Sequence, residues 1–287
     1  MHKNNTNIIK LLDKALKDFD EFKTKYQGPG WKMRLKRFLR YKTHYINYIL
    51  QRFGIIKPKL DYYYLLRLGP GPELKVIQYL LSIIKPNDIF YDIGSNYGLF
   101  IEVTKEIAKE IHAFEPLPKC FAYLQKNYGK YSNIFLNNLA LGDKINEVEF
   151  YQSKDENTSG ASTLIKEVAY RNIKKIKPIK VKMITLDEYI KSHNPPTIMK
   201  IDVEGAESFI IDGAKNLFKD YNPIIIMEVW SGKNGLDFSI KAVDKLLNYG
   251  YKCYLFENQE LKEYYREKII EWIKNSKLSN ENFIFLK

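Results

Sequence analysis

The sequence predicts an α/β protein built on a doubly wound, mostly parallel β-sheet, and three observations lead to this class. From residue 88 onward, short apolar segments of strand length alternate with segments of helical periodicity, which is the pattern of strand–helix–strand units. Hydrophobic residues form 45% of the 287 residues, enough for one large core. The longest apolar stretches, VIQYLLSII and PIIIMEVW, fall short of the roughly 18 residues that a membrane span requires.

The predicted strands are apolar or alternating segments that lie between turn residues. In chain order they read IFYDIG, IHAFE, NIFLNNLAL, NEVEFYQ, PIKVKMI, TIMKID, PIIIMEV, YKCYLFE and NFIFLK. Helices are predicted between several of them, over Leu99–Lys109, Pro118–Tyr128, Ala206–Phe218 and the segment SIKAVDKLLNYG, which ends at Gly250. The last two strands are candidates for an antiparallel edge of the sheet, separated by the helix-like segment KEYYREKIIEWIKNS.

The first part of the chain differs from the rest in its charge. The net charge is +12, and the segment from Phe22 to Leu60 contains 11 Lys and Arg residues and no acid. Subtracting 11 from 12 leaves about +1 for the remainder of the chain. Apolar residues recur at helical spacing in NIIKLLDKALKDFDEFKTKY. We therefore predict a basic helical N-terminal extension over residues 1–70, followed by an α/β domain over residues 71–287.

Three interpretations of the basic segment, residues 22–60, remain open. The segment is suited to peripheral contact with an anionic membrane, where each Lys or Arg contributes about 1 kcal/mol. It is also suited to binding nucleic acid phosphates, or to forming a solvated helix pair. The chain start lacks the apolar region of a secretory signal, and Cys120 and Cys253 have no disulfide or metal spacing. We expect a cytoplasmic protein, peripheral to the inner face of the membrane under the first interpretation.

A glycine-containing loop follows the first predicted strand and precedes a predicted helix. In YDIGSNYGLF, Gly94 and Gly98 permit a tight turn and a close approach of a ligand to the backbone. Ligands of open α/β sheets bind beyond the carboxyl ends of the strands. Glu115 ends the next strand, 115 − 92 = 23 residues after Asp92, where an acid can accept both hydroxyls of a ribose. The pattern predicts a ligand that contains adenosine.

The acid in this loop discriminates between adenosine ligands. Dinucleotide loops read GxGxxG and offer amides to a pyrophosphate, whereas Asp92 would repel phosphate. S-adenosylmethionine carries an ammonium and a sulfonium group, which a carboxylate attracts. The sequence therefore favours S-adenosylmethionine as the cofactor. The simpler alternative is that Asp92 caps the turn and that the glycines serve packing.

The segment from about Phe90 to Trp230 resembles the FkbM family of S-adenosylmethionine-dependent methyltransferases. The motifs that carry the resemblance are YDIGSNYGLF, IHAFEPLP, NNLALGD, VKMITLDEYI, MKIDVEGAESFIIDGA and PIIIMEVW, and they come in the family's order. They cover about half of the chain. The resemblance implies a class I methyltransferase fold for residues 71–287, with a seven-stranded sheet and an antiparallel edge strand. It also implies O-methylation in the biosynthesis of glycans or secondary metabolites.

The same resemblance implies roles for eight residues around the cofactor. They are Asp92, Gly94, Asn96 and Gly98 at the methionine end, Glu115 and Pro116 at the ribose, and Asn138 and Ala140 beside the adenine. The identity of the methyl acceptor does not follow from the resemblance, because the family acts on diverse substrates.

A second set of polar residues lies in MKIDVEGAES, at the end of a predicted buried strand. Lys200, Asp202 and Glu204 alternate and would share one face of a strand. In a functional interpretation, Asp202 orients or deprotonates a hydroxyl, Glu204 is a second candidate base, and Lys200 tunes their charge. The structural alternative is a Lys200–Asp202 ion pair with helix capping by Glu204 or Glu207. Asp202 and Glu228 offer oxygen ligands to a metal, but no third ligand is evident and no metal is predicted.

These observations predict an S-adenosylmethionine-dependent O-methyltransferase that acts on a hydroxyl of a glycan, sugar or related metabolite. In-line methyl transfer needs no covalent enzyme intermediate, so the lack of an obvious Ser or Cys nucleophile is no objection. One alternative is an RNA or other nucleic-acid methyltransferase that uses the basic arm. Another is a cofactor-binding protein without catalysis, against which the acids of MKIDVEGAES argue.

Overall fold

The computed structural model describes residues 72–153, 162–172, 176–257 and 260–287. The predicted basic extension, including residues 22–60, lies outside the described residues. The chain divides into two compact units, Met1–Ile84 and Lys85–Lys287, and the described part of the first unit contains helix α4 (Pro72–Ile83). The predicted domain boundary at residue 70 therefore stays a prediction.

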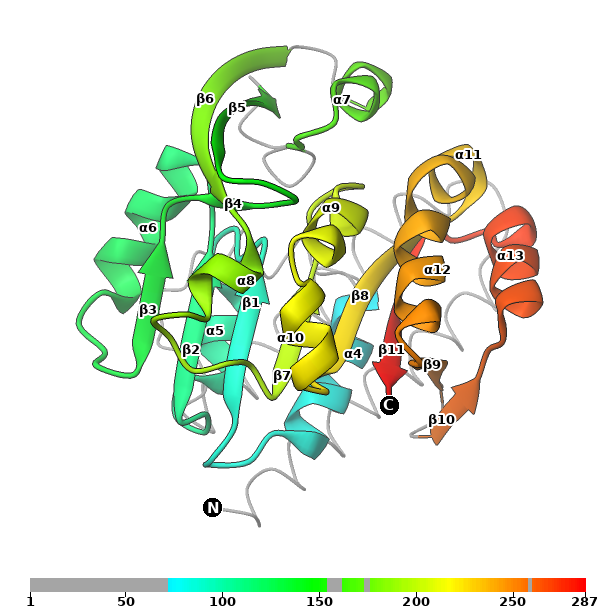
Figure 1. Cartoon of the computed structure of the whole chain (residues 1–287), viewed down its shortest axis with the longest axis horizontal. Helices are drawn as coiled ribbons and strands as arrows, with labels where there is room; N and C mark the ends of the chain where they lie inside the picture. Colours follow the sequence, from blue (N-terminus) through cyan, green and yellow to red (C-terminus); the bar gives the residue numbers. More distant parts are fainter. Residues whose placement is uncertain (1–71, 154–161, 173–175, 258–259) are drawn as a thin grey trace, which may run out of the picture. The chain divides into compact units, whose positions relative to one another are not determined.

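The second unit is built on an eight-stranded sheet with the order β10-β9-β11-β8-β7-β1-β2-β3 (Figure 1). Strands β8, β7, β1, β2 and β3 run parallel, whereas β11 is antiparallel to β8 and β9, and β10 is antiparallel to β9. The strands are β1 (Ile89–Ile93), β2 (Glu110–Phe114), β3 (Ile134–Asn137), β7 (Ile198–Ile201), β8 (Ile224–Trp230), β9 (Lys252–Glu257), β10 (Glu260–Glu263) and β11 (Asn280–Leu286). The predicted mostly parallel sheet with an antiparallel edge is confirmed. It has eight strands rather than seven because the segment ELKE forms β10 and pairs with β9. The last two residues of this segment, Lys262 and Glu263, were expected to begin a helix.

A second, three-stranded sheet has the order β4-β6-β5. Its strands are β4 (Ala140–Leu141), β5 (Asn146–Ser153) and β6 (Ile176–Ile184), and helix α7 (Lys166–Asn172) lies between β5 and β6 in the chain. In Figure 1 this sheet and α7 lie beyond the carboxyl ends of the parallel strands. We call the described residues between 140 and 184 the inserted segment. The segments NEVEFYQ and PIKVKMI thus form strands as predicted, but they pair with each other and not with the main sheet.

The remaining helices differ in burial. They are α5 (Leu99–Thr104), α6 (Pro118–Tyr128), α8 (Leu186–Tyr189), α9 (Glu207–Asp212), α10 (Lys215–Asp220), α11 (Gly232–Asn234), the π-helix η2 (Gly235–Ser239), α12 (Ile240–Asn248) and α13 (Arg266–Asn275). All six residues of α5 are buried, whereas α11 has no buried residue. The helix predicted over Ala206–Phe218 is divided in two at Gly213. A Cβ atom on Gly213 would lie 2.0 Å from the carbonyl oxygen of Gly142, so the break permits a close backbone contact with the inserted segment.

Helices cover both faces of the main sheet, and each face carries buried apolar side chains. On one face, side chains such as Tyr91, Met199 and Met227 form a buried core with residues of α8, α9, α10, α12 and α13. Figure 1 shows α8, α10 and α12 in front of this face and α5 behind the sheet. Because side chains alternate along a strand, Asp92 and Lys200 point to the face that α5 covers. Within the described ranges, no helix is both long and apolar enough to cross a membrane.

Candidate active site

The loop after β1 makes the tight turn that the sequence predicts. Gly94, Asn96 and Gly98 have φ angles of 86°, 49° and 81°, and all three lie in the left-handed region. A Cβ atom on Gly94 would lie 1.9 Å from the carbonyl oxygen of Asp202, and one on Gly98 would lie 2.7 Å from Cε2 of Tyr128. Both glycines are therefore required by contacts of the loop with the protein itself, before any ligand is considered.

Asp92 is a buried acid with an unpartnered oxygen. Its exposed fraction is 1%, and no hydrogen-bond donor among the described residues reaches Oδ2. Burial raises the pKa of Asp92 to about 7, although the Lys200 ammonium acts in the opposite direction. An unpartnered buried carboxyl is costly for a folded protein. The arrangement fits a site that receives a cationic group from a ligand.

Glu115 fastens the loop after β1 to the end of β2. The backbone N–H of Asn96 donates to Oε2 of Glu115, and that of Leu117 donates to Oε1, both at 2.8 Å. Burial raises the pKa of Glu115 to about 7, and the two backbone hydrogen bonds partly offset this effect. Each carboxylate oxygen can accept more than one hydrogen bond, so the carboxylate keeps acceptor capacity for ligand hydroxyls.

The residues implied beside the adenine follow β3. The side-chain amide of Asn138 donates to the backbone carbonyl oxygens of Glu115 at 2.8 Å and Pro116 at 3.2 Å. Ala140 is buried in β4 and pairs with Met183. The structure thus brings the ends of β1, β2 and β3 together at one edge of the sheet, where the sequence places the cofactor. The role of each residue toward the cofactor stays a prediction.

Lys200 and Asp202 form the ion pair that the structural alternative expects. Nζ of Lys200 lies 2.9 Å from Oδ2 of Asp202 and 5.4 Å from the ring centroid of Phe100. The lysine is only 1% exposed. Burial by itself would lower the pKa of Lys200, but the carboxylates of Asp202 and Glu228 outweigh burial and raise it. The Lys200 side chain therefore keeps its positive charge, which lies beside the acids at this edge of the sheet.

Glu204 has an unusual backbone conformation for its residue type. Its φ angle is 56°, and that of Gly205 is 96°. The Thr163 hydroxyl donates to the Glu204 carbonyl oxygen at 2.8 Å. Oε1 of Glu207 accepts the N–H groups of Val203 at 3.3 Å and Gly205 at 3.1 Å. Neither Glu204 nor Glu207 caps α9, whose N-cap Ala206 has no side-chain hydrogen bond. Glu207 instead binds the loop before the helix, which leaves the carboxylate of Glu204 for another role.

Three carboxylates converge at the carboxyl ends of β7 and β8. One oxygen from each of Asp202, Glu204 and Glu228 lies within 4.8 Å of the others. Burial, followed by the like charges of Glu228 and Asp202, raises the pKa of Glu204 well above its usual value. Three oxygen ligands at this separation could hold a divalent cation, and Glu204 supplies the third ligand that the sequence did not reveal.

Glu228 is held by two side chains that sequence reasoning did not connect to it. The indole N–H of Trp230 donates to Oε2 at 2.9 Å, and the Asn280 side-chain amide donates to Oε1. Burial is the largest cause of the raised pKa of Glu228. Trp230 lies two residues after Glu228 on the same strand face, which is a signal in the sequence. Asn280 comes from β11, 52 residues away, and no local pattern links it to the site.

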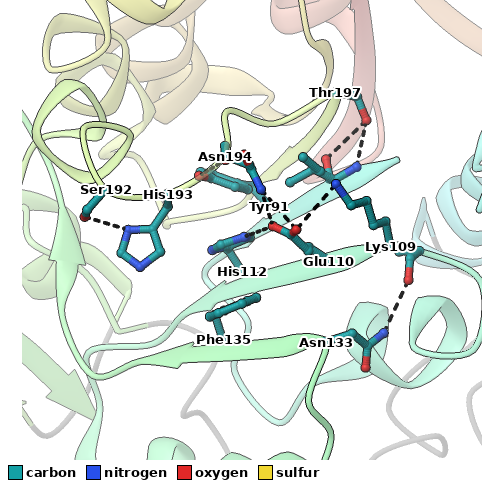
Figure 2. Close-up of polar contacts among 12 residues, drawn as sticks. Tyr91, Lys109, Glu110, His112, Asn133, Phe135, Ser192, His193, Asn194 and Thr197 are labelled. Atoms are coloured by element: carbon teal, nitrogen blue, oxygen red, sulfur yellow. Dashed lines mark hydrogen bonds and ion pairs between the residues drawn. The ribbon is translucent and has the colours of Figure 1, made fainter. Parts of the chain in front are cut away.

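A different polar cluster occupies the opposite edge of the sheet, at the amino-terminal ends of β1, β2 and β7 (Figure 2). Glu110 accepts two hydrogen bonds from the Asn194 side-chain amide, at 3.0 and 3.1 Å, and lies 3.3 Å from Nε2 of His112. Nδ1 of His112 lies 2.8 Å from the Tyr189 hydroxyl. His193 stacks on the Tyr189 ring, with centroids 4.0 Å apart. Neither histidine therefore belongs to the edge that carries Asp92 and Glu204.

In α/β enzymes, ligands bind at the carboxyl ends of the parallel strands. The glycine-containing loop and the buried acids lie at this edge of the sheet, so they define a ligand-binding site of that class. The chain matches the methyltransferase FkbM domain over residues 92–253, more than half of its length, and it belongs to this family. The resemblance inferred from the motifs is confirmed.

Two curated proteins are similar in sequence to this chain. The 2-O-methyltransferase NoeI of Sinorhizobium fredii is 29% identical over 161 residues, which cover 51% of this chain and 65% of that protein. The hexuronic acid methyltransferase AglP of Haloferax volcanii is 27% identical over 179 residues, which cover 61% of this chain and 68% of that protein. The matches thus span about two thirds of the relatives' length. A crystal structure of a methyltransferase FkbM from Methylobacillus flagellatus superimposes with a TM-score of 0.45 at 13% identity, over 83% of this chain and 54% of that chain.

Proposed function

We propose that the protein is an S-adenosylmethionine-dependent O-methyltransferase that acts on a hydroxyl of a sugar or glycan. The observation that carries the cofactor assignment is the unpartnered, buried oxygen of Asp92, at the end of β1. A ligand ammonium would satisfy this oxygen, whereas a phosphate would be repelled by it. The sugar assignment rests on the names of the two relatives, a 2-O-methyltransferase and a hexuronic acid methyltransferase.

The residues at the carboxyl edge fit the two ends of this cofactor. Asp92 would bind the ammonium at the methionine end, where Gly94, Asn96 and Gly98 shape the loop. Glu115, already oriented by two backbone N–H groups, would accept the ribose hydroxyls. Residues Pro116, Asn138 and Ala140 would border the ribose and the adenine. When bound, S-adenosylmethionine supplies a methyl group on a sulfonium, which is ready for in-line displacement by an oxygen.

The acceptor side needs a group that takes the proton of the attacking hydroxyl. The sequence favoured Asp202 over Glu204 for this role, whereas the contacts support the reverse order. Asp202 is paired with Lys200, while no described residue donates a hydrogen bond to the Glu204 carboxylate. Its raised pKa makes Glu204 a stronger base than an ordinary carboxylate, once it is ionised. We infer that Glu204 accepts the proton and that Asp202 and Lys200 position the hydroxyl.

Two steps test this proposal. Thermal shift and calorimetry with S-adenosylmethionine, S-adenosylhomocysteine and NAD should show stabilisation by the first two ligands only. Transfer of a labelled methyl group should then be measured to methyl β-D-glucuronide, methyl β-D-glucopyranoside and an RNA oligonucleotide. Methylation of a glycoside is expected. Stabilisation by NAD alone would refute the cofactor assignment, and methylation of RNA alone would establish the nucleic-acid alternative, which no described contact favours.

A further inference from the structure

Thr163 links the inserted segment to the strained loop that carries Glu204, and we propose that Thr163 is a positioning residue for this proton-accepting carboxylate. The inference rests on the proposed function, since it concerns the base of that reaction. Thr163 is fully buried, with an exposed fraction of 0%. Its hydroxyl donates to the Glu204 carbonyl oxygen at 2.8 Å and accepts the N–H of Ile165 at 3.0 Å.

The position of Thr163 is set by the inserted segment. Its N–H donates to the Tyr151 carbonyl oxygen at 3.1 Å, and the N–H of Tyr151 donates back at 2.9 Å. These bonds tie Thr163 to β5, outside the main sheet. The residues after it pack against the site as well, because Ile165 and Val168 share an apolar cluster with Trp230. The hydroxyl is therefore a fixed donor that the inserted segment presents to the Glu204 backbone.

Glu204 needs such a donor because its backbone conformation is unfavourable. A non-glycine residue in the left-handed region costs about 1–2 kcal/mol, and glutamate has no local hydrogen bond that compensates for it. Glycine at position 204 would avoid this cost. The glutamate side chain is therefore present at the expense of the stability of the folded protein. The bonds from Thr163 and Glu207 hold the loop from both sides, and they keep the Glu204 carboxylate beside Asp202 and Glu228.

The alternative is that Thr163 only stabilises the fold. The two roles differ in what happens when the hydroxyl is removed and the shape is kept. If Thr163 positions Glu204, the carboxylate moves away from Asp202 and Glu228, and its surroundings change. If Thr163 is purely structural, the protein loses stability while the environment of the Glu204 carboxylate stays the same.

The substitutions Thr163→Val and Thr163→Ser separate these roles, with Thr104→Val as the matched control. Thr104 is also 0% exposed, and its hydroxyl donates to a backbone carbonyl oxygen, that of Phe100, at 2.6 Å. We expect Thr163→Val to lower kcat by about 10- to 100-fold with methyl β-D-glucuronide or methyl β-D-glucopyranoside as probe. The dissociation constant of S-adenosylmethionine should change less than about 2-fold. Thr163→Ser should restore kcat, and Thr104→Val should leave it unchanged.

A measurement without any acceptor keeps the inference testable if Thr163→Val folds poorly or if neither glycoside is methylated. The environment of the Glu204 carboxylate can be followed at one fixed pH by carbon-13 NMR of glutamate-labelled protein, with Glu204→Gln identifying the signal. Thr163→Val, or the milder Thr163→Ala, should shift this signal, whereas Thr104→Val should not. An unchanged chemical shift would overturn the inference, as would a loss of kcat that Thr104→Val reproduces.

The double variant Thr163→Val with Glu204→Gln distinguishes a failure of the positioning role of Thr163 from a failure of Glu204 as the base. When Thr163 acts through Glu204, Thr163→Val adds little to the loss of kcat in a Glu204→Gln background, because the carboxylate that it positions is already gone. Fully additive losses would overturn the positioning role alone. Full activity of Glu204→Gln by itself would instead refute Glu204 as the base in the proposed function.

Discussion

The two edges of the main sheet use buried polar groups in opposite ways. At the amino-terminal edge, Glu110, His112 and Asn194 satisfy one another through direct hydrogen bonds. At the carboxyl edge, Asp92 keeps an unpartnered oxygen, and Glu204 has a strained backbone. Unsatisfied and strained groups persist in folded proteins mainly where function requires them. The comparison therefore assigns chemistry to the carboxyl edge and stability to the amino-terminal edge.

The largest expected effect is at Glu204. Replacing it with glutamine keeps the shape but removes the carboxylate that would take the proton. Loss of a general base lowers kcat by about 10²- to 10⁴-fold, and we expect a value in the lower half of this range because Asp202 stays nearby. The measurement is kcat with the glycoside that the wild-type protein methylates. Affinity for S-adenosylmethionine should be unchanged, and a variant that also loses cofactor binding would show that Glu204 belongs to the cofactor site.

Asp92→Asn is expected to have the next largest effect. The loss of a charged contact to the ligand ammonium costs about 1.5–3 kcal/mol, which weakens binding by about 10- to 100-fold. In the wild-type protein, Asp92 has a raised pKa of about 7, so binding a cation should release a proton near neutral pH. Calorimetry in buffers of different ionisation enthalpy measures this release.

The variant Asp92→Asn should bind without that proton release. The stability of the unliganded variant also tests whether the two edges of the sheet differ in their roles. A carboxyl group whose pKa is raised from 3.8 to about 7 lowers the stability of the folded state as the pH rises across this interval. Removing the group should therefore preserve or increase stability at pH 8 in the absence of ligand. A large loss of stability would mean that Asp92 serves the fold, as its counterparts at the other edge do.

The sequence predicted the tight turn after β1, because the evidence for it was local. Asp92 and the two glycines lie in one short loop, and the left-handed angles found there follow from residue type. The break at Gly213 was not predictable, because it depends on a close contact with Gly142 that helical periodicity does not record. Thr163 was missed for a similar reason: 41 residues separate it from Glu204, and only the tertiary structure joins them.

At the amino-terminal edge, the contribution of His112 to stability should change with pH in the direction opposite to that of Asp92. The change in the free energy of unfolding should also be smaller. Burial lowers the pKa of His112 from 6.5 to about 4. The unfolded chain therefore binds a proton between these values that the folded protein does not, so the free energy of unfolding falls as the pH falls below 6.5. Between pH 6.5 and 5 the loss amounts to about 1.6 kcal/mol. Urea unfolding at the two pH values measures it.

His112→Gln should reduce this sensitivity to acid and should leave the affinity for S-adenosylmethionine unchanged. The glutamine can still hydrogen bond toward Glu110 or Tyr189, so the variant is expected to fold. If its stability falls with pH as steeply as that of the wild-type protein, another group causes the acid sensitivity, and the assignment of stability to this edge loses its main support.

The smallest effect is expected at His193, which also provides the sharpest contrast with Glu204. Histidine is a common base in enzymes, but His193 stacks on Tyr189 at the amino-terminal edge, and its Nδ1 lies 3.0 Å from the Tyr189 carbonyl oxygen. His193→Ala removes a stacked pair worth about 0.5–1.5 kcal/mol, which for a domain of this size lowers Tm by only a few degrees. Methyl transfer, measured well below the Tm, should be unchanged. A substantial loss of kcat with an intact fold would contradict the division between the edges, because it would place a catalytic group at the edge that the structure assigns to stability.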